Sequence, residues 1–208
     1  MPVCDCHTHL FRRDAIISAT SSTILDANAY YSVGIHPWNS AECHNPELME
    51  HLFSLPNVVG VGESGMDMLR GADEKTQIQL MERHIEWSES YGLPLILHCV
   101  KSANQIVALK KTHRPNQPWI IHGFRLNAHV AEMLMKHDIY MSFGRFFNPE
   151  ALRLIPDSRL LIETDDSQMT INDIAELIGE GRNTSADNIL TLSANTIHTL
   201  FTKISQRC

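Results

Sequence analysis

Short apolar runs alternate with longer amphipathic stretches along nearly the whole chain, and this alternation constrains the fold more than any other feature. The runs are rich in Val, Ile, Leu and Tyr, as the strands of a buried parallel sheet are. Repeated strand–helix alternation indicates βαβ units around such a sheet. The sequence predicts eight strands, at residues 3–6, 16–20, 30–35, 58–62, 95–97, 119–121, 139–142 and 160–163.

Seven helices are predicted between and after these strands, and boundary signals support several of them. Ser102 and Asn127 are suitable N-caps, and Gly92 follows the longest helix. Eight strands with intervening helices predict an α/β fold, a TIM-like barrel, with residues 1–208 forming a single domain. The predicted helices are residues 46–55, 73–91, 102–113, 128–137, 149–154, 171–179 and 185–202.

The start of the barrel is expected to be abbreviated or distorted. Between His9 and Ile16 there is no room for a crossover helix, because such a connection needs about a dozen residues. Two alternatives follow from this. Either residues 16–20 are not a parallel barrel strand, or the barrel is incomplete at that point.

Composition narrows the class of protein. Of the 208 residues, 43% are hydrophobic and 20% are charged, as in soluble globular domains. A net charge of −7 argues against a broad basic surface that coats nucleic acid, but it allows a site that grips one phosphate. Five cysteines, an odd count without a CxxC motif, predict reduced thiols. With no signal pattern and no apolar run of the ~18 residues of a membrane span, a cytoplasmic monomer is expected.

The placement of the histidines points to a metal centre. Five of the twelve lie at or just beyond the C-terminal ends of predicted strands: His7, His9, His36, His98 and His122. The other seven are expected to be surface or packing residues. Glu63 and Asp165 also follow predicted strands, and in a parallel barrel these ends share the face that carries the active site. Imidazoles and carboxylates bind divalent metals, so we predict as ligands His7, His9, Glu63, His98, His122 and Asp165.

Each of these residues, taken alone, also has an ordinary structural explanation. The pair His7 and His9, which point the same way on a strand, occurs by chance in many chains. Glu63 fits a surface ion pair, and Asp165 fits a turn. Independent structural roles would scatter the six residues, whereas they lie at the ends of five strands. Three further carboxylates are expected around the ligands as hydrogen-bond partners: Asp5, Asp67 and Glu163.

The ordered motifs resemble the TatD-like metal-dependent hydrolases of the amidohydrolase superfamily. The resemblance runs from His7 to Phe201, and six motifs in order make it specific. Residues 7–10 look like the opening HxH, residues 34–38 like GxHP, and residues 62–67 like GE-x-G-x-D. Residues 95–98 and 121–124 match the two later histidine strands, residues 161–165 match ETD, and Asn195 with Phe201 match the closing helix.

The resemblance implies a centre of two divalent metal ions. One ion would be held by His7, His9, Glu63 and Asp165, and the other by Glu63, His98 and His122. Asp165 would orient and deprotonate the attacking water. The family's link to DNA hydrolysis implies DNA ends, or a small phosphodiester, as the substrate. Mixed histidine and carboxylate ligation suits Zn, Mn or Fe better than Mg.

The chain departs from the family pattern around the substrate rather than around the metals. The arginine expected after His98 is replaced by Val100, and Met68 replaces an aromatic residue. Asp166, followed by Ser167, stands where Ser-Pro usually follows ETD. The candidates for binding a phosphoryl oxygen are His36, Lys101 and Arg125.

Three functions therefore compete. The leading hypothesis is a phosphodiesterase or deoxyribonuclease that acts on DNA ends through a metal-activated water. A hydrolase of another ester, lactone or amide could use the same centre, because a fold does not fix a substrate. The third alternative is a non-catalytic, metal-binding relic of the fold, which the altered substrate loops suggest.

Overall fold

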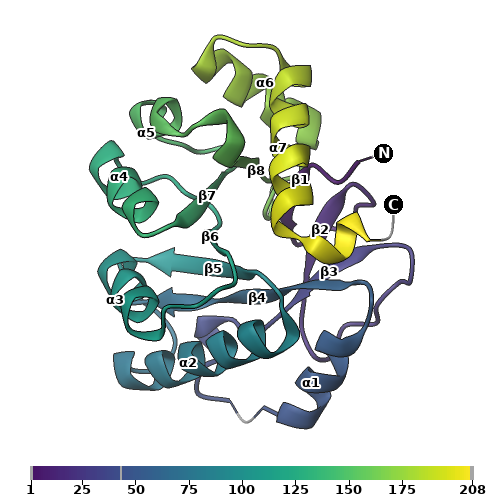
Figure 1. Cartoon of the computed structure of the whole chain (residues 1–208), viewed down its shortest axis with the longest axis vertical. Helices are drawn as coiled ribbons and strands as arrows, with labels where there is room; N and C mark the ends of the chain where they lie inside the picture. The colour runs from purple at the N-terminus through teal and green to yellow at the C-terminus, as the bar shows by residue number, and fades with distance from the viewer. Residues whose placement is uncertain (1, 43, 207–208) are drawn as a thin grey trace.

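The structure, a computed structural model, describes residues 2–42 and 44–206, and it confirms the predicted TIM-like barrel. Eight parallel strands close in sequence order, and β8 pairs with β1 (Figure 1). The strands are β1 Asp5–Thr8, β2 Ala15–Ala19, β3 Tyr30–Val33, β4 Val58–Asp67, β5 Leu95–Val100, β6 Trp119–Ile121, β7 Ile139–Phe143 and β8 Leu160–Ile162.

Helices cover the outside of the barrel (Figure 1). One α-helix lies in each connection from β3 to β8, and three follow β8. Ser102 occupies the N-cap position of α3, but its hydroxyl donates to the Met66 carbonyl instead of capping the helix. The predicted helix over residues 185–202 ends at Leu200, and a short helix follows. The helices are α1 Pro46–Ser54, α2 Glu74–Tyr91, α3 Ala103–His113, α4 Ala128–Lys136, α5 Pro149–Leu154, α6 Ile171–Arg182, α7 Ala186–Leu200 and α8 Thr202–Ser205.

Both alternatives for the start of the barrel are wrong, because β2 pairs in parallel with β1 and β3 and the barrel closes. Residues 9–14 and 20–29, which the structure describes in full, form these connections without a helix. The expected distortion is an irregular register, in which Asp5 pairs with Ala15 and Thr8 with Ile17. The overlap is so short that six residues, at about 3.3 Å each, can return the chain to the start of β2.

An apolar core fills the barrel and closes its N-terminal end. Strand residues such as Ile16 and Ile96 pack there against Phe201 and Ile204 of the C-terminal segment. Phe201 is fully buried. The Lys203 ammonium donates to three carbonyl oxygens just before and at the start of β4, at 2.9 Å, 3.1 Å and 3.0 Å. The C-terminal segment therefore seals the end of the barrel opposite the predicted metal centre.

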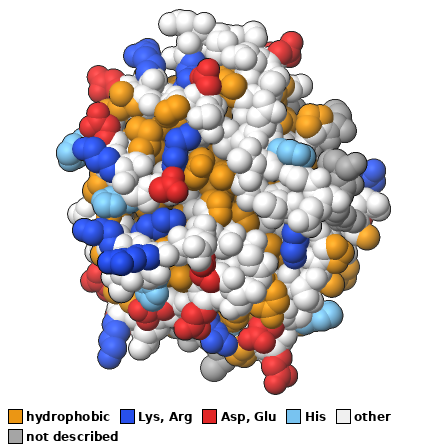
Figure 2. Space-filling model, in the orientation of Figure 1, with side chains coloured by type: hydrophobic (Ala, Val, Ile, Leu, Met, Phe, Trp, Pro, Cys, Tyr) orange, Lys and Arg blue, Asp and Glu red, His pale blue; other side chains and the backbone are white. Residues whose placement is uncertain are grey.

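The described residues agree with three predictions from the sequence: no membrane-spanning helix, reduced cysteines and no broad basic surface. No helix in the described part of the chain is long and apolar enough to cross a bilayer. Cys4, Cys6 and Cys99 are free thiols, while Cys43 and Cys208 lie outside the described residues. Figure 2 shows basic and acidic side chains interspersed over one face of the molecule rather than a continuous basic surface.

Candidate metal centre

Glu63 lies at the centre of an imidazole cluster at the C-terminal end of the barrel. We expected it just after a strand, but β4 continues through Asp67, so Glu63 is part of the strand. The polar and glycine-containing sequence of residues 62–67 is atypical of a strand, which explains the difference. Glu63 is only 5% exposed, so its carboxylate faces the protein interior.

Two glycines let β4 carry Glu63 close against β5. Gly62 has φ 148° and Gly65 has φ 116°, conformations that favour glycine. A Cβ atom at either position would collide with the backbone of β5, at Ile96 or at His98. The β4–β5 register also shifts in this segment, and such a bulge re-aims a side chain. The backbone therefore places the Glu63 carboxylate beside the His98 ring.

Six histidine and carboxylate side chains converge at this position, together with His36. Five imidazole nitrogens surround the Glu63 carboxylate. Those near Oε1 are His36 Nε2 at 3.0 Å, His98 Nδ1 at 3.1 Å and His122 Nε2 at 2.8 Å, and those near Oε2 are His9 Nε2 at 3.2 Å and His7 Nε2 at 3.5 Å. Asp165 Oδ1 lies 3.4 Å from His9 Nε2 and 3.8 Å from His7 Nε2. The structure thus brings the six predicted ligands together.

The cluster has the donor atoms that a divalent cation needs. Three overlapping groups each place their ligand atoms within 4.8 Å of one another: His7 with His122 and Asp165, His7 with His9 and Glu63, and His36 with Glu63 and His98. Both ring nitrogens of the buried His7 lack a hydrogen-bond partner in the described part of the chain. A buried imidazole without a partner is costly, and a metal bond would satisfy it. The residues present therefore fit a metal.

Electrostatics favour the metal-binding forms of Glu63 and His7, but not of every ring. Burial tends to raise the pKa of Glu63, but the rings of His122, His36 and His7 outweigh it and hold this pKa well below its usual value. Burial and the neighbouring His122 lower the pKa of His7. The two groups are thus a carboxylate and a neutral imidazole, the forms in which both residues bind metals. Burial tends to lower the pKa of His122, but the carboxylates of Glu63 and Glu163 outweigh it and raise this pKa well above its usual value.

The ring of His98 is held by two residues of the barrel mouth. Asp67 Oδ2 lies 3.1 Å from His98 Nε2 and accepts a hydrogen bond from the Trp38 indole N–H at 2.7 Å. Burial tends to raise the pKa of Asp67, but Trp38, the Leu69 N–H and His98 together lower it. A proton on Nε2 of His98, donated to this carboxylate, leaves Nδ1 directed at Glu63.

Glu163 lies beside His122, the candidate ligand that follows β6. Its Oε1 accepts from the Gly123 N–H at 2.6 Å and is 3.6 Å from His122 Nδ1. The side chain is fully buried, and burial tends to raise its pKa, but the neighbouring His122 outweighs this and lowers it. Glu163 therefore lies on the side of His122 opposite Glu63, but the structure has no hydrogen bond between it and His122 Nδ1.

Asp5 acts on the backbone rather than on a ring. It accepts from the His7 N–H at 3.3 Å, and from the Thr164 N–H at 3.1 Å and hydroxyl at 2.6 Å. Burial raises the pKa of Asp5 to about 7, although the Thr164 hydrogen bonds lower it. The Asp165 N–H donates to the His7 carbonyl, and the His9 N–H donates to the Asp165 carbonyl, both at 3.0 Å. These bonds join the HxH segment to the end of β8.

The remaining predicted site residues differ in placement. Lys101 and Arg125 lie in loops after β5 and β6, both exposed, and neither side chain makes a hydrogen bond or ion pair with the described residues. Of the seven histidines assigned to surface or packing roles, His84 is buried within α2. Trp38 and Thr164 were not predicted as site residues. Both stand inside the quoted motifs, but their partners Asp67 and Asp5 are distant in sequence, so no local pattern could pair them.

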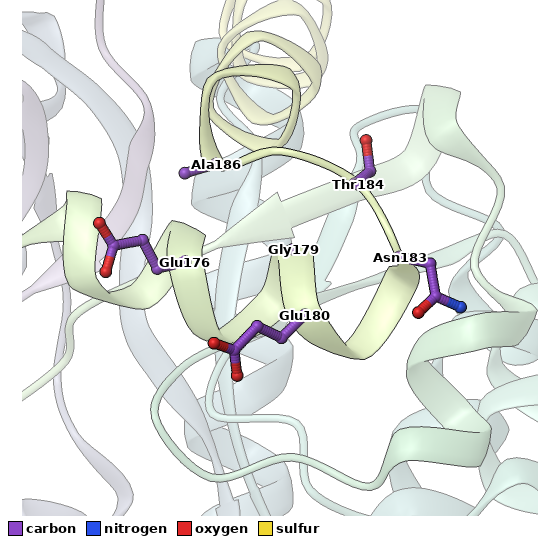
Figure 3. Close-up of a pocket in the computed structure, with 6 residues that line it drawn as sticks. All are labelled: Glu176, Gly179, Glu180, Asn183, Thr184 and Ala186. Atoms are coloured by element: carbon purple, nitrogen blue, oxygen red, sulfur yellow. The ribbon is translucent and has the colours of Figure 1, made fainter.

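A hollow away from the metal centre does not have the geometry of a metal site. It has a volume of about 700 Å³ and lies at the C-terminal end of α6, lined by Glu176, Gly179, Glu180, Asn183, Thr184 and Ala186. Figure 3 shows that the side chains of Glu176, Asn183 and Thr184 point in different directions. None of the six residues belongs to the metal centre, and diverging side chains cannot surround a cation.

Comparison with known proteins agrees with this geometry. An uncharacterized metal-dependent hydrolase of Buchnera aphidicola is 32% identical over 153 residues, which cover 69% of this chain and 58% of that protein. A 3'-5' ssDNA/RNA exonuclease TatD of Enterobacter lignolyticus is 26% identical over 172 residues, which cover 77% of this chain and 66% of the exonuclease. The chain therefore spans less than two thirds of either relative's own length.

A solved structure supports the fold, and a family model covers the chain. The crystal structure of YjjV, a TatD homologue of Escherichia coli, superposes with a TM-score of 0.72 at 22% identity, covering 90% of this chain and 86% of YjjV. The family described as TatD related DNase matches residues 3–201. Because this match extends over nearly the whole chain, the chain belongs to the TatD-related DNase family.

Proposed function

We propose that the chain is a divalent-metal-dependent phosphodiesterase that hydrolyses DNA ends through a metal-activated water. The observation that carries the proposal is the convergence of five imidazoles on the buried Glu63 carboxylate, beside Asp165. Membership of the TatD-related DNase family supports it, as does the exonuclease name of one relative. The relatives named only as metal-dependent hydrolases support the broader statement, hydrolysis with a metal.

We infer two ions, with Glu63 shared between them. His7 and His9 gather at its Oε2, with Asp165 beside both rings, while His98 and His122 gather at its Oε1. Divalent cations held there would neutralise charge on a phosphoryl group and lower the pKa of an attacking water. The donor set favours Zn, Mn or Fe over Mg.

The chain's own residues then have distinct roles. Asp165 is about one third exposed, so its carboxylate can reach both the ligands and a water in the mouth, and take the proton of that water. Lys101 and Arg125, exposed on neighbouring loops and free of described partners, can turn toward phosphate oxygens. His36 contacts Glu63, which makes it a further ligand candidate as much as a phosphate donor.

Single-stranded DNA labelled at either end tests the proposal. Protein loaded with Mn or Zn should release nucleotides, and Asp165→Asn should reduce the rate by about 10²- to 10⁴-fold, as loss of a general base does. Asp187→Asn makes the same chemical change on the exposed side of α7 and should leave the rate unchanged. Normal activity of Asp165→Asn would contradict the role of Asp165.

Two further measurements separate the other functions. Hydrolysis of an ester, lactone or amide panel, with no release from DNA, would favour another hydrolase on the same centre. Elemental analysis of protein purified without added metal should find bound divalent metal. Protein that stays empty after addition of Zn and Mn would favour a non-catalytic relic.

A further inference from the structure

Large exposed hydrophobic side chains gather around the mouth of the barrel. The described part of the chain exposes eight of them, and six lie on loops that leave the C-terminal ends of strands. One of the six is Ile24 on the β2–β3 loop, and the other five follow β1, β3, β4, β6 and β7. We call these five the apolar rim: Phe11, Trp38, Leu69, Leu126 and Phe146. Scattered exposed residues need no explanation, but a ring of them around a polar centre marks a binding surface.

Trp38 lies on the His98 side of the centre. Its ring centroid is 4.6 Å from that of His36 and 5.9 Å from that of His98, and the guanidinium carbon of Arg70 is 4.6 Å from its centroid. Trp38 remains 48% exposed. A flat apolar surface and a cation thus stand together within reach of the candidate ligands.

Phe146 forms the same kind of pair on the other side. The guanidinium carbon of Arg145 lies 4.7 Å from its ring centroid, and Arg145 is 3.6 Å from Asp166, the neighbour of Asp165. Phe146 is 60% exposed. Trp38 follows β3 and Phe146 follows β7, and strands four places apart in a closed barrel of eight face each other across the axis. The centre therefore lies between two arginine–aromatic pairs.

We propose that these two pairs bind nucleobases of single-stranded DNA on either side of the scissile phosphate. This proposal rests on the phosphodiesterase function above and names the residues that select its substrate. Bases stack on aromatic rings and guanidinium planes regardless of their sequence, and the guanidinium groups also attract the backbone phosphates. In a duplex the bases are stacked on one another, so only a single strand can occupy both pairs.

The arginines decide against an apolar acyl substrate. An acyl chain would need an apolar rim alone, whereas two of the three exposed rings of the rim, Trp38 and Phe146, carry a cation; no cation over Phe11 is found among the described residues. A polynucleotide carries the complementary groups in a repeating pattern: flat bases, which stack on aromatic rings, and anionic phosphates, which attract guanidinium groups. Leu69 and Leu126 extend the apolar surface between the pairs without providing stacking.

Tryptophan fluorescence offers a test that does not depend on catalysis. Of the three tryptophans, Trp87 is 4% exposed and Trp119 is fully buried, so an external quencher reaches Trp38. In EDTA, oligothymidylate should quench the emission, and an abasic phosphodiester of the same length should not. No quenching by oligothymidylate at concentrations that bind the protein would overturn the proposal.

Matched variants isolate the rings. Trp38→Leu and Phe146→Leu should each weaken binding of labelled oligothymidylate by roughly tenfold, the lower part of the range for one base–aromatic stack, and leave binding of the abasic strand unchanged. Trp38→Phe loses the indole N–H to Asp67, as Trp38→Leu does, but keeps a ring, so it should retain most of the affinity. Leu154→Ala removes an exposed side chain of α5, outside the rim, and should change nothing.

The outcomes separate this proposal from the proposed function. Base-dependent binding without hydrolysis by the metal-loaded protein would keep the rim and contradict the phosphodiesterase. Hydrolysis of DNA that is insensitive to Trp38→Leu and Phe146→Leu would keep the enzyme and overturn the rim. Equal affinity for abasic and base-bearing strands, or hydrolysis of acyl esters that needs Trp38, would also overturn it. If Trp38→Leu fails to fold, the exposed Phe146 carries the test alone.

Discussion

The two ends of the barrel are built from opposite kinds of side chain. At the C-terminal end, five imidazoles and Asp165 crowd around Glu63, and both ring nitrogens of His7 lack partners in the described part of the chain. At the N-terminal end, Phe201 and aliphatic residues fill the barrel, and Lys203 satisfies three carbonyl oxygens. If the proposed function is right, the C-terminal end serves binding at some cost to stability, and the N-terminal end serves stability alone.

The difference suggests that chemistry and stability can be changed independently. A core that is closed at one end can support unsatisfied polar groups at the other, provided that the sheet between them is rigid. The eight strands are the main structural elements that connect the two ends. Substitutions at one end should then leave the measured property of the other end unchanged, and the following predictions test that separation from the largest expected effect to the smallest.

The largest effect is expected for Glu63→Gln. Loss of a residue that orients a ligand costs about 10- to 100-fold in metal affinity, so loss of the shared carboxylate should cost at least about 10³-fold. Bound metal stabilises wild-type protein by mass action, so added Zn or Mn should raise the melting temperature of wild type and not of Glu63→Gln. Glu180→Gln, the same change on the surface of α6, is the control. A full metal-induced shift in Glu63→Gln would break the comparison.

The opposite end is tested by Phe201→Ala. Removing a buried aromatic ring costs about 3–5 kcal/mol in the free energy of unfolding, because a cavity remains. Urea titration in EDTA measures this loss, while the metal affinity of the folded fraction should stay within about twofold. Phe201→Leu, which keeps most of the volume, should cost less than about 1.5 kcal/mol and serves if the alanine variant does not fold. A large loss of metal affinity in Phe201→Leu would show that the two ends are coupled.

His84 sharpens the comparison, because it is a buried histidine whose nitrogens are both satisfied. Its Nε2 accepts from the Ile35 N–H at 3.0 Å, and its Nδ1 lies 2.8 Å from the Leu80 carbonyl. Burial lowers the pKa of His84 to about 4, with a smaller contribution from the nearby His44, although the hydrogen bond to the Leu80 carbonyl tends to raise this pKa. In the unfolded chain the pKa of His84 is near 6.5, so as the pH falls the unfolded chain binds a proton on this ring at a higher pH than the folded chain does.

His84 should therefore stabilise the fold above about pH 6.5, and this contribution, about 3 kcal/mol, should disappear as the pH falls through 4. The unfolding free energy of wild type in EDTA should fall over this interval more steeply than that of His84→Gln. His198→Gln changes an exposed histidine of α7 and should keep the wild-type slope. Parallel curves for wild type and His84→Gln would show that this ring does not titrate as its burial requires.

The sequence predicts the strands and the six candidate ligands for one physical reason. Buried parallel strands are continuous apolar runs, so a polar residue such as His98 or His122 marks where a run ends. The same rule does not locate the ends of β4 and β5, because β4 continues through the polar residues after Gly62 and β5 continues past His98 to Val100. The short β1–β2 connection was misjudged as well, because the length of a crossover depends on how far the two strands overlap, and that overlap is not visible in the sequence.

Contacts between distant segments were also beyond prediction. The indole of Trp38, after β3, donates to Asp67 at the end of β4. Lys203, near the C-terminus, donates to the carbonyls of Phe53, Leu55 and Val58. No periodicity links such positions, since the closed barrel alone brings them together. The organisation of residues 1–208 as a single domain stays a prediction.

Lys203→Met should give the smallest effect of the series. The ammonium donates to the carbonyls of Phe53, Leu55 and Val58, and burial lowers the pKa of Lys203. Methionine keeps the apolar stem but leaves these carbonyls with fewer donors, which should cost about 1–3 kcal/mol in the free energy of unfolding. Lys75→Met in the exposed first turn of α2 should change it by less than about 0.5 kcal/mol. If Lys203→Met altered metal affinity instead of stability, the N-terminal end of the barrel would contribute to the metal site, and the contrast between the two ends would be wrong.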